Sequence, residues 1–286
     1  MNYAVLIQNR KSVREFRNKT VSTEILEQVK TYYRQSARRL LPGIATELRL
    51  FGTEAREALE GAAGYRNFLI GAPQYMVLLS EPHPQSYLNA GFLMEDLILK
   101  LTDLELQSCW VTFTDSDQIK EALGIDSSLE VAAIAAFGYG ARTIRRLRLN
   151  IKSMSDIDIS AKRQYFEPKR SVGELVYSGT WGSRDGLDNA IGFYDDMLWE
   201  ALYAASLAPS YLNRQAYRFL LKPGSVTLVS IPDPYSVPVD TDLSLGIVLY
   251  HFTAVAEEWA GKLSWHFGPE NVELPEGHRA IASAAL

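Results

Sequence analysis

The chain has 286 residues, of which 47% are hydrophobic and 22% charged, the composition of an ordinary globular protein. Its formal net charge of -5, from 34 acidic and 29 basic residues, argues against the broad basic surface that nucleic-acid binding requires. The single cysteine, Cys109, cannot form an internal disulfide, and no metal-ligand spacing surrounds it, so a buried packing role is favoured over a nucleophilic one.

The N-terminal segment and the apolar runs predict a soluble, cytoplasmic protein without a membrane partner. Charged residues follow the first few apolar residues at once, which is unlike a signal peptide. The longest apolar runs, such as residues 131–137, are too short to span a bilayer.

Apolar patterns in the first half predict two helices and two strands. The helix over residues 21–35 begins at a serine or threonine N-cap and has acidic residues in its first turns. Short apolar runs predict buried strands at 75–79 and 131–137. The helix at 91–106 is apolar on several faces, which indicates burial on more than one side.

The second half repeats this order of elements. We expect a helix over 194–207, strands over 217–221 and 226–231, and a helix over 243–259. Between the halves, residues 142–166 are polar, without a sustained period, and are interpreted as a connection.

Matching residues support a degenerate duplication. Gly91 precedes Trp110 by the same number of residues as Gly246 precedes Trp265. We therefore predict two related halves, residues 1–150 and residues 151–286.

Residues 10–14, here called the basic motif, are the first candidate for ligand binding. Arg10, Lys11, Ser12 and Arg14 place three cations and a hydroxyl just ahead of a predicted helix. The guanidinium fork matches phosphate oxygens in two-point contact, and serine adds a short hydrogen bond. The alternative is a solvated basic turn.

Residues 208–219, here called the Pro-Ser-Asn motif, are the second candidate. Pro209 and Ser210 end the preceding helix, and Tyr211, Asn213 and Gln215 follow. Amide side chains offer both donors and acceptors, as the edge of a planar heterocycle requires. The alternative is an ordinary helix-to-strand loop with a capping serine and a turn asparagine.

Together the two motifs resemble those of the FMN-dependent nitroreductase family, in particular a branch in which two subunit-like halves are fused into one chain. The first is similar to that family's Arg-Arg-Ser-x-Arg segment, and the second to its Ala-Pro-Ser-x-x-Asn-x-Gln-Pro-Trp-x-Phe segment. Residues 91–140 follow the family order as well. The resemblance implies an α+β fold, an α/β three-layer sandwich, whose two degenerate halves form a pseudo-dimer around central helices.

The resemblance also implies how a flavin site is divided between the halves. In the family, a homodimer holds FMN at its interface, where the basic motif of one subunit meets the phosphate and the Pro-Ser-Asn motif of the other meets the flavin ring. In this chain the basic motif is best preserved in the first half and the Pro-Ser-Asn motif only in the second. We therefore expect one complete composite site and one eroded site.

The counterpart segments support that expectation. Residues 35–42, where the first half would carry its own Pro-Ser-Asn motif, keep no Asn or Gln at matching spacing, and Gly173 replaces the second arginine of the second basic segment. By resemblance Arg145 and Arg146 match a further phosphate-binding cation of the family. The alternative for these two residues is a solvated charge cluster.

Two departures from the family concern the flavin ring. Ala216-Tyr217 replaces the family's Pro-Trp, and residues 263–267 are bulkier than the small residues usual after the second interface helix.

Two other kinds of site are not supported by the sequence. Scattered histidines without a partner at ligand spacing argue against a metal site, and Gly138-Tyr139-Gly140 is not a dinucleotide fingerprint.

By resemblance we expect an FMN-dependent NAD(P)H oxidoreductase that reduces nitroaromatics, quinones or similar flat acceptors by a ping-pong reaction, with no catalytic side chain. The fused chain would act as a monomer, with further oligomerisation open. The alternative is a non-catalytic ligand-binding or scaffold protein whose flavin pocket is closed by Trp265, His266 and Phe267. A related flavin chemistry, such as dehalogenation or ring cleavage, is a third reading.

Overall fold

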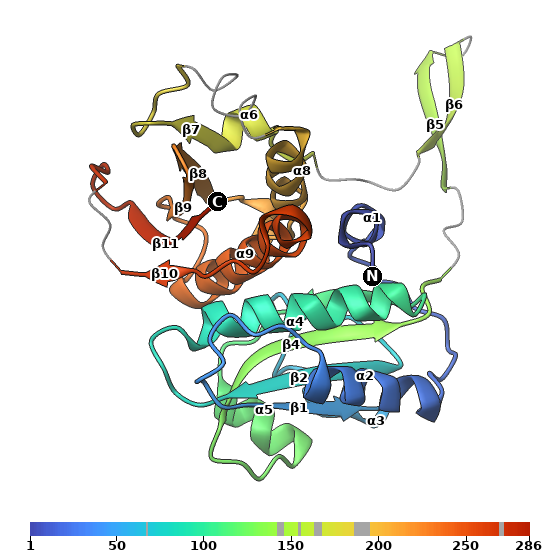
Figure 1. Ribbon diagram of the computed structural model, residues 1–286. Coiled ribbons are helices and arrows are strands. Elements are labelled where there is room, and N and C mark those ends of the chain that lie inside the picture. Colours follow the sequence, from blue (N-terminus) through green and yellow to red (C-terminus); the bar gives the residue numbers. More distant parts are fainter. Residues whose placement is uncertain (67, 142–145, 154–155, 163–167, 186–194, 269–271) are drawn as a thin grey trace.

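The computed structural model describes the chain except residues 67, 142–145, 154–155, 163–167, 186–194 and 269–271 (Figure 1). The first part contains α1 Tyr3–Asn9, α2 Thr23–Gln35, β1 Thr46–Phe51, α3 Glu54–Leu59, β2 Gln74–Ser80, α4 Ser86–Asp103, β3 Gln107–Val111, α5 Ser116–Leu123 and β4 Glu130–Gly138. A hairpin of β5 Arg146–Ser153 and β6 Asp156–Lys162 follows. The second part contains α6 Val172–Leu175, β7 Val176–Ser178, α8 Asp195–Ser206, the short 3₁₀ helix Tyr211–Asn213, β8 Tyr217–Lys222, β9 Ser225–Ser230, α9 Pro238–Ala260, β10 His266–Phe267 and β11 Arg279–Ala285.

The first sheet is the middle layer of a three-layer sandwich. Its strands lie in the order β1-β2-β4-β3, all antiparallel. Helices α2 and α4 pack on one face, and α3 and α5 pack on the other. β2 is buried along its whole length, as its unbroken apolar run indicated, because helices cover both faces of the sheet.

The second sheet repeats the first and adds one strand. Its order is β10-β11-β9-β8-β7, so β8, β9, β11 and β10 occupy the positions of β1, β2, β4 and β3. The extra strand β7 pairs in parallel with β8. Helices α8 and α9 supply most of the helical surface in the core of this half. The sheet topology therefore repeats along the chain, in agreement with the duplication expected from the sequence.

Helices α4 and α9 cross at two glycines, between the two sheets (Figure 1). A Cβ atom added to Gly91 would overlap the carbonyl oxygen of Leu243, and one added to Gly246 would overlap that of Leu88. Each glycine thus faces the carbonyl three residues before the other glycine, which is a reciprocal contact. The absence of a side chain at both positions lets the two backbones touch.

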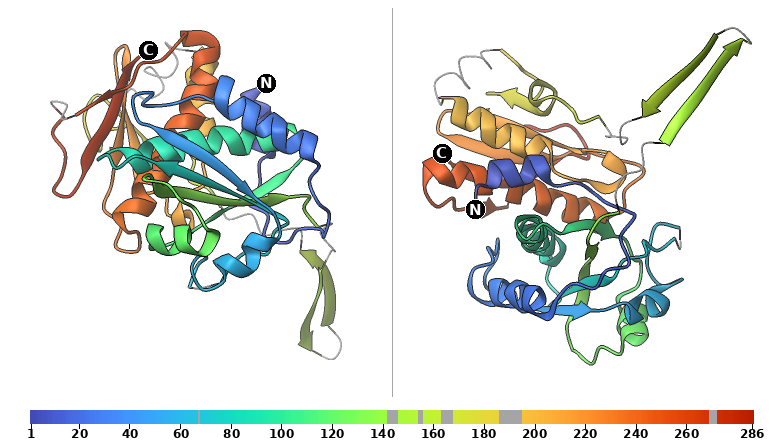
Figure 2. Two further views of the ribbon diagram at one scale, coloured as in Figure 1. Left: turned by 90° about the horizontal axis from the view of Figure 1, so that it is seen from below. Right: turned by 90° about the vertical axis from the view of Figure 1, so that its right-hand side faces the viewer.

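The N-terminal helix α1 belongs by packing to the second half. Ile7 is part of the core formed by α8, α9 and the second sheet, and Tyr3 and Leu6 pack against that core. Figure 2 shows α1 beside α8 and α9 in its right-hand view. Residues from the start of the chain therefore complete the core of the second half.

Most expected elements are present, with shifted ends. Helix α2 begins after its N-cap Ser22, as predicted, and α4 begins at Ser86, five residues before the expected start at Gly91. Residues 142–166, interpreted as a polar connection between the halves, contain two paired strands where the structure describes them, which the sequence analysis did not predict. The predicted boundary at residue 150 falls within β5. The division into 1–150 and 151–286 stays a prediction.

We predict that Gly246→Ala lowers the free energy of unfolding by about 1–3 kcal/mol or more, because the new methyl group must force α4 and α9 apart. Alanine normally stabilises a helix relative to glycine by about 1 kcal/mol. A decrease in the free energy of unfolding would therefore itself be evidence of the close contact. Urea denaturation measures the effect. Gly173→Ala in α6 is the matched control, since nothing lies within 4 Å of an added Cβ there. Equal or higher stability of Gly246→Ala would contradict the crossing described here.

Candidate functional site

The basic motif lies against the edge strand β3 of the first sheet. Ser12 forms a parallel bridge with Ser108, and the Val13 amide donates to the Ser108 carbonyl at 2.9 Å. Further on, the Arg17 amide donates to the Tyr139 carbonyl at 2.8 Å. These backbone bonds fix the path of residues 10–17 beside the start of β3 and the end of β4.

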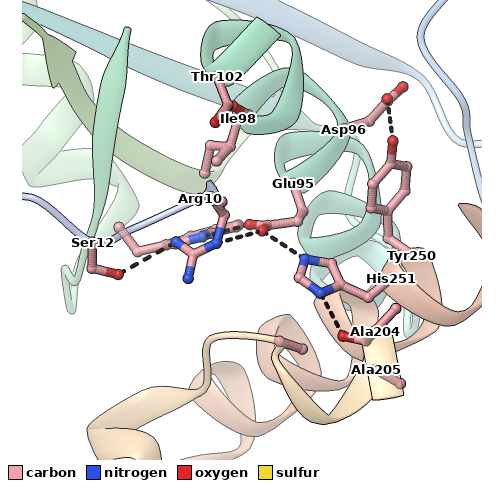
Figure 3. A network of polar contacts seen from close by, with 12 residues as sticks. Arg10, Ser12, Glu95, Asp96, Ile98, Thr102, Ala204, Ala205, Tyr250 and His251 are labelled. Atoms are coloured by element: carbon pink, nitrogen blue, oxygen red, sulfur yellow. Dashed lines mark hydrogen bonds and ion pairs between the residues drawn. The ribbon is translucent and has the colours of Figure 1, made fainter. Parts of the chain in front are cut away.

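Arg10 is held by a buried carboxylate between the two halves (Figure 3). Its Nε lies 3.4 Å from Oε1 of Glu95 on α4, and the two side chains are 8% and 0% exposed. The same Glu95 carboxylate accepts a hydrogen bond from Trp110 Nε1 at 3.0 Å and lies 2.9 Å from Nε2 of His251 on α9. The Arg10 side chain therefore binds mainly to Glu95 at the interface of the central helices. Its Nη1 donates a hydrogen bond to the Ser12 hydroxyl at 3.4 Å.

Glu95 carries a negative charge at neutral pH despite full burial. Burial alone raises the pKa of this carboxyl, but the Arg10 charge and the hydrogen bonds from His251 and Trp110 outweigh burial and hold the pKa below its usual value. The other nitrogen of His251, Nδ1, lies 3.0 Å from the carbonyl oxygen of Ala204 on α8. One carboxylate thus joins the basic motif, α4, β3 and α9, and through His251 reaches α8.

A second buried carboxylate, Asp96, lies next to this network. It accepts hydrogen bonds from Tyr250 on α9 at 2.5 Å, from Tyr32 on α2 at 2.8 Å and from the backbone amide of Arg38 at 2.6 Å. Burial raises the pKa of Asp96, and the three hydrogen bonds oppose that rise. Asp96 therefore fixes the segment after α2 to the central helices.

The far end of β3 meets the second half of the chain. The Gly64 amide donates to the Thr112 carbonyl at 2.7 Å, directly after β3. The neighbouring Tyr65 ring contacts the ring of Tyr211 in the Pro-Ser-Asn motif edge to face, with centroids 6.5 Å apart. Since a strand rises about 3.3 Å per residue, Ser108 and Thr112 are about 13 Å apart. The basic motif and the Pro-Ser-Asn motif thus lie toward opposite ends of one strand edge.

The amide side chains of the Pro-Ser-Asn motif hold the loop itself. Oδ1 of Asn213 accepts from Lys169 Nζ at 2.6 Å, and its Nδ2 donates to the Pro168 carbonyl at 3.1 Å. Gln215 is 1% exposed, and its amide bonds the backbone of Arg170 and Ser206. The Gln215 side-chain amide is therefore buried and satisfied within the protein, and the contact of Gln215 with a flavin ring stays a prediction.

The backbone conformation of this loop explains why it needs these stabilising hydrogen bonds. Leu212, Asn213 and Gln215 all have positive φ, between 47° and 55°, a region that costs non-glycine residues energy. The Ser210 hydroxyl accepts a hydrogen bond from the backbone amide of Gln215 at 3.0 Å. The Ser244 hydroxyl accepts one from the backbone amide of Tyr211 at 3.1 Å. Pro209, Ser210 and Tyr211 are thereby held at the end of α8.

The second basic segment does not occupy the position of the first. Ser12 lies beside β3, whereas Lys169 and Arg170 lie against the Pro-Ser-Asn motif and lead into β7, on the opposite side of the second sheet from β10. Lys169 Nζ also donates to the Ala208 carbonyl at 2.9 Å. The second basic segment therefore supports the Pro-Ser-Asn motif.

The bulky residues after α9 lie along β10. The Trp265 Nε1 donates to Thr253 at 2.9 Å, and its ring packs against Phe252. His266 and Phe267 form β10, which pairs with β11 and is the counterpart of β3. In the alternative weighed from the sequence these residues close the flavin pocket; in the structure they lie at the edge of the second sheet that corresponds to β3, not at β3 itself.

Two other features bear on ligand binding. Arg145 lies outside the described residues, and Arg146 begins β5. A cavity of about 10 Å³ lies beside Ser210, Tyr211, Ser244 and Leu245 and has room for about one water. Among the described residues no group of His, Cys, Asp or Glu is placed to hold a metal ion, and no described helix could cross a membrane.

The comparisons with known proteins identify the family. Residues 2–169, more than half of the chain, match the family model described as "Putative TM nitroreductase". The chain belongs to this nitroreductase family. None of the curated proteins matches the chain.

A full-length solved structure agrees at the level of the fold. A protein from Thermotoga maritima, titled a putative nitroreductase, aligns with 100% of this chain and 94% of its own, with a TM-score of 0.60 and 18% identity. A nitroreductase family protein from Clostridium difficile aligns with 50% of this chain and 86% of its own, with a TM-score of 0.42 and 24% identity. The nitroreductase fold, with two halves in one chain, is thus present here.

Several site residues escaped the sequence analysis. Glu95 and His251 lie on different central helices, and the histidines were considered only as metal ligands. His251 follows Gly246 by five residues, about 1.4 helical turns, and so lies close to the crossing, which was the available signal. Tyr65 and Lys169 gave no signal, because their partners are distant in sequence.

We predict that Glu95→Gln lowers the free energy of unfolding at pH 7 by about 3 kcal/mol or more, because Arg10 is left buried without its counter-charge. The pKa of Glu95 is depressed in the folded state, so its stabilisation is present above the unfolded pKa and is lost as pH falls through the folded pKa. The difference in the free energy of unfolding between wild type and variant should therefore become smaller as the pH falls. Chemical denaturation from pH 7 to pH 3 measures both effects, with exposed Glu121→Gln as the control. A constant difference across that range would refute this assignment.

Proposed function

We propose that this nitroreductase family member is an FMN-dependent oxidoreductase with one composite site along the outer edge of β3. The observation that carries the proposal is the arrangement on that edge: the basic motif lies at one end, and the Tyr65–Tyr211 contact with the other half lies at the other. An elongated ligand with an anionic end and a flat end suits such a site. FMN has both.

The chemistry of the donor set fits FMN at the phosphate end. The Ser12 hydroxyl and the Arg14 guanidinium are exposed on a segment whose backbone is fixed to β3. Ser12, Lys11 and Arg14 would bind the phosphate, since hydroxyl and cationic groups together suit phosphate oxygens. Arg10 positions this segment through Glu95, and its Nη1 orients the Ser12 hydroxyl.

At the ring end, backbone groups and aromatic side chains would contact the flavin ring. Pro209, Ser210 and Tyr211 would line the ring, while Asn213 and Gln215 hold the loop in its strained conformation. The rings of Tyr65 and Tyr211 would shield the bound ring from water on the side where the halves meet. When bound, FMN supplies hydride acceptance from NAD(P)H and electron transfer to an acceptor.

The same surface supports a proposal for the substrates. Tyr65, Phe68 and Leu212 are exposed around the ring end, at 44%, 75% and 49%. Such an apolar rim suits flat acceptors, so we propose NAD(P)H as the reductant and nitroaromatics or quinones as acceptors, alternating at one place. Against the non-catalytic alternative, Trp265 packs on Phe252, and His266 and Phe267 form β10, away from β3.

We predict that Arg14→Ala weakens FMN binding at least about 10-fold, because it removes a charge-assisted hydrogen bond worth about 1.5–3 kcal/mol. Quenching of flavin fluorescence during titration of apoprotein measures the affinity. Arg17→Ala is the matched control, since Arg17 is also exposed and lies three residues along the same segment, outside the basic motif. Its affinity should equal that of wild type.

Two results would overturn the proposal. Wild-type protein that binds no FMN contradicts the cofactor assignment, and equal loss of affinity in both arginine variants contradicts the site. With FMN bound, flavin bleaching by NADH or NADPH and its recovery on addition of a quinone should follow. Failure of either half-reaction would contradict the oxidoreductase reaction but not the binding site.

A further inference from the structure

The ring of His251 on α9 lies between two oxygen acceptors. Its Nδ1 is 3.0 Å from the carbonyl oxygen of Ala204, and its Nε2 is 2.9 Å from a carboxylate oxygen of Glu95 (Figure 3). A carbonyl oxygen and an ionised carboxylate can only accept hydrogen bonds, and a neutral imidazole has one N–H to donate. Both contacts are therefore hydrogen bonds only when both ring nitrogens carry a proton.

The additional proton belongs to the ring and not to Glu95. Three donors face the Glu95 carboxylate: the Arg10 guanidinium, Trp110 Nε1 and the His251 ring. Burial raises the pKa of Glu95, but the Arg10 charge and these hydrogen bonds outweigh burial and hold it below its usual value. An ionised carboxylate has no proton to donate to Nε2, so the ring donates to both oxygens.

The resulting cluster has an excess of positive charge. Arg10 and the doubly protonated His251 are cations, whereas Glu95 is the anion between them. Their side chains are buried, at 8%, 0% and 0% exposure, and buried charges are only weakly screened by salt. Because Nη1 of Arg10 donates to the Ser12 hydroxyl at 3.4 Å, this excess charge lies next to the basic motif. Loss of the His251 proton would remove it.

A second carboxylate beside the cluster does not alter this difference. Asp96 accepts its hydrogen bonds from other groups, and within the described chain it forms none with His251. The remaining ionisable side chains around the cluster are Tyr3 on α1, Arg14 in the basic motif, Arg38 after α2, Cys109 on β3, Tyr250 on α9, and the exposed Glu200 and Tyr203 on α8. A proton lost from His251 therefore changes the charge of the cluster by one unit, whatever the charge of Asp96.

We propose that His251 is held as a buried imidazolium whose charge, acting through Glu95 and Arg10, strengthens the binding of a phosphate group at Ser12 and Arg14. His251 is a positioning residue, because it bonds Glu95, Glu95 pairs with Arg10, and Arg10 orients the Ser12 hydroxyl. The protonation of the ring depends on the protein alone. Its effect on a phosphate rests on the proposed function. A rise in pH removes the proton and so weakens phosphate binding.

The first test is nuclear magnetic resonance of the protein without flavin, labelled with ¹⁵N in its histidines. At pH 7 both ring nitrogens of His251 should carry a hydrogen, and the signals are assigned by their loss in His251→Gln. A single N–H on this ring at pH 7 would overturn the proposal, and this result does not depend on flavin binding.

The second test compares FMN with riboflavin, which has the same ring system but no phosphate. In His251→Gln an amide can still donate to Glu95 but carries no charge. We expect this variant to bind FMN roughly 10-fold more weakly than wild type at pH 7, the effect of one unit charge over about 10 Å in a protein. Riboflavin affinity should be unchanged. Between pH 7 and pH 9.5 the FMN affinity of wild type should fall toward that of the variant.

His83→Gln is the matched control, since His83 is exposed in the loop before α4, and its flavin affinities should equal those of wild type. Circular dichroism checks that each variant is folded. If His251→Gln does not fold, the pH series of wild type with the two flavins decides alone.

Three outcomes separate the possible failures. Equal weakening of FMN and riboflavin in His251→Gln, or an FMN affinity of wild type that does not fall relative to riboflavin as the pH rises, would show a merely structural role for His251 and overturn the proposal. Wild-type protein that binds neither flavin would instead contradict the proposed flavin site, and with it the effect on phosphate.

Discussion

The contact between the backbones of α4 and α9 at Gly91 and Gly246 is the constraint on which the rest of the structure depends. Both helices are buried over most of their length, and each glycine faces a carbonyl of the other helix. A side chain at either position would separate the halves. The close approach brings Glu95 of α4 within hydrogen-bonding distance of His251 of α9 and so makes the buried network around Arg10 possible.

The duplicated halves have diverged in how they use their basic segments. In the first half this segment pairs with β3 and presents Ser12 and Arg14 to solvent. In the second half, Lys169 and Arg170 form hydrogen bonds that stabilise a strained loop with three residues of positive φ. One half thus provides the strand edge and the other the supported loop. The second basic segment thus stabilises the Pro-Ser-Asn motif and does not lie along a strand edge as the first one does.

The sequence predicted what depends on local pattern. Helix α2 with its Ser22 cap, the buried strand β2 and the repeat of elements all follow from capping and apolar periodicity. Family resemblance and the equal spacing from Gly91 and Gly246 to their tryptophans indicated the two-half fold. These features were predictable because they involve residues close in sequence or a pattern that occurs twice.

The partners of individual side chains could not be predicted. Arg10 was expected to hold phosphate, but its guanidinium pairs with Glu95, a residue 85 positions away on another element. Gln215 was expected at the ring, and its hydrogen bond to the backbone of Arg170 was not predicted. The strands β5 and β6 were missed because each spans only a few residues in a segment that is polar as a whole.

We propose that both halves build one flavin site on the edge of β3. A crystal structure of the protein with FMN tests this site most directly. We predict one FMN for each chain, with its phosphate beside Ser12 and Arg14 and its ring beside Tyr65 and Tyr211. A flavin along β10, or one in each half, would contradict it.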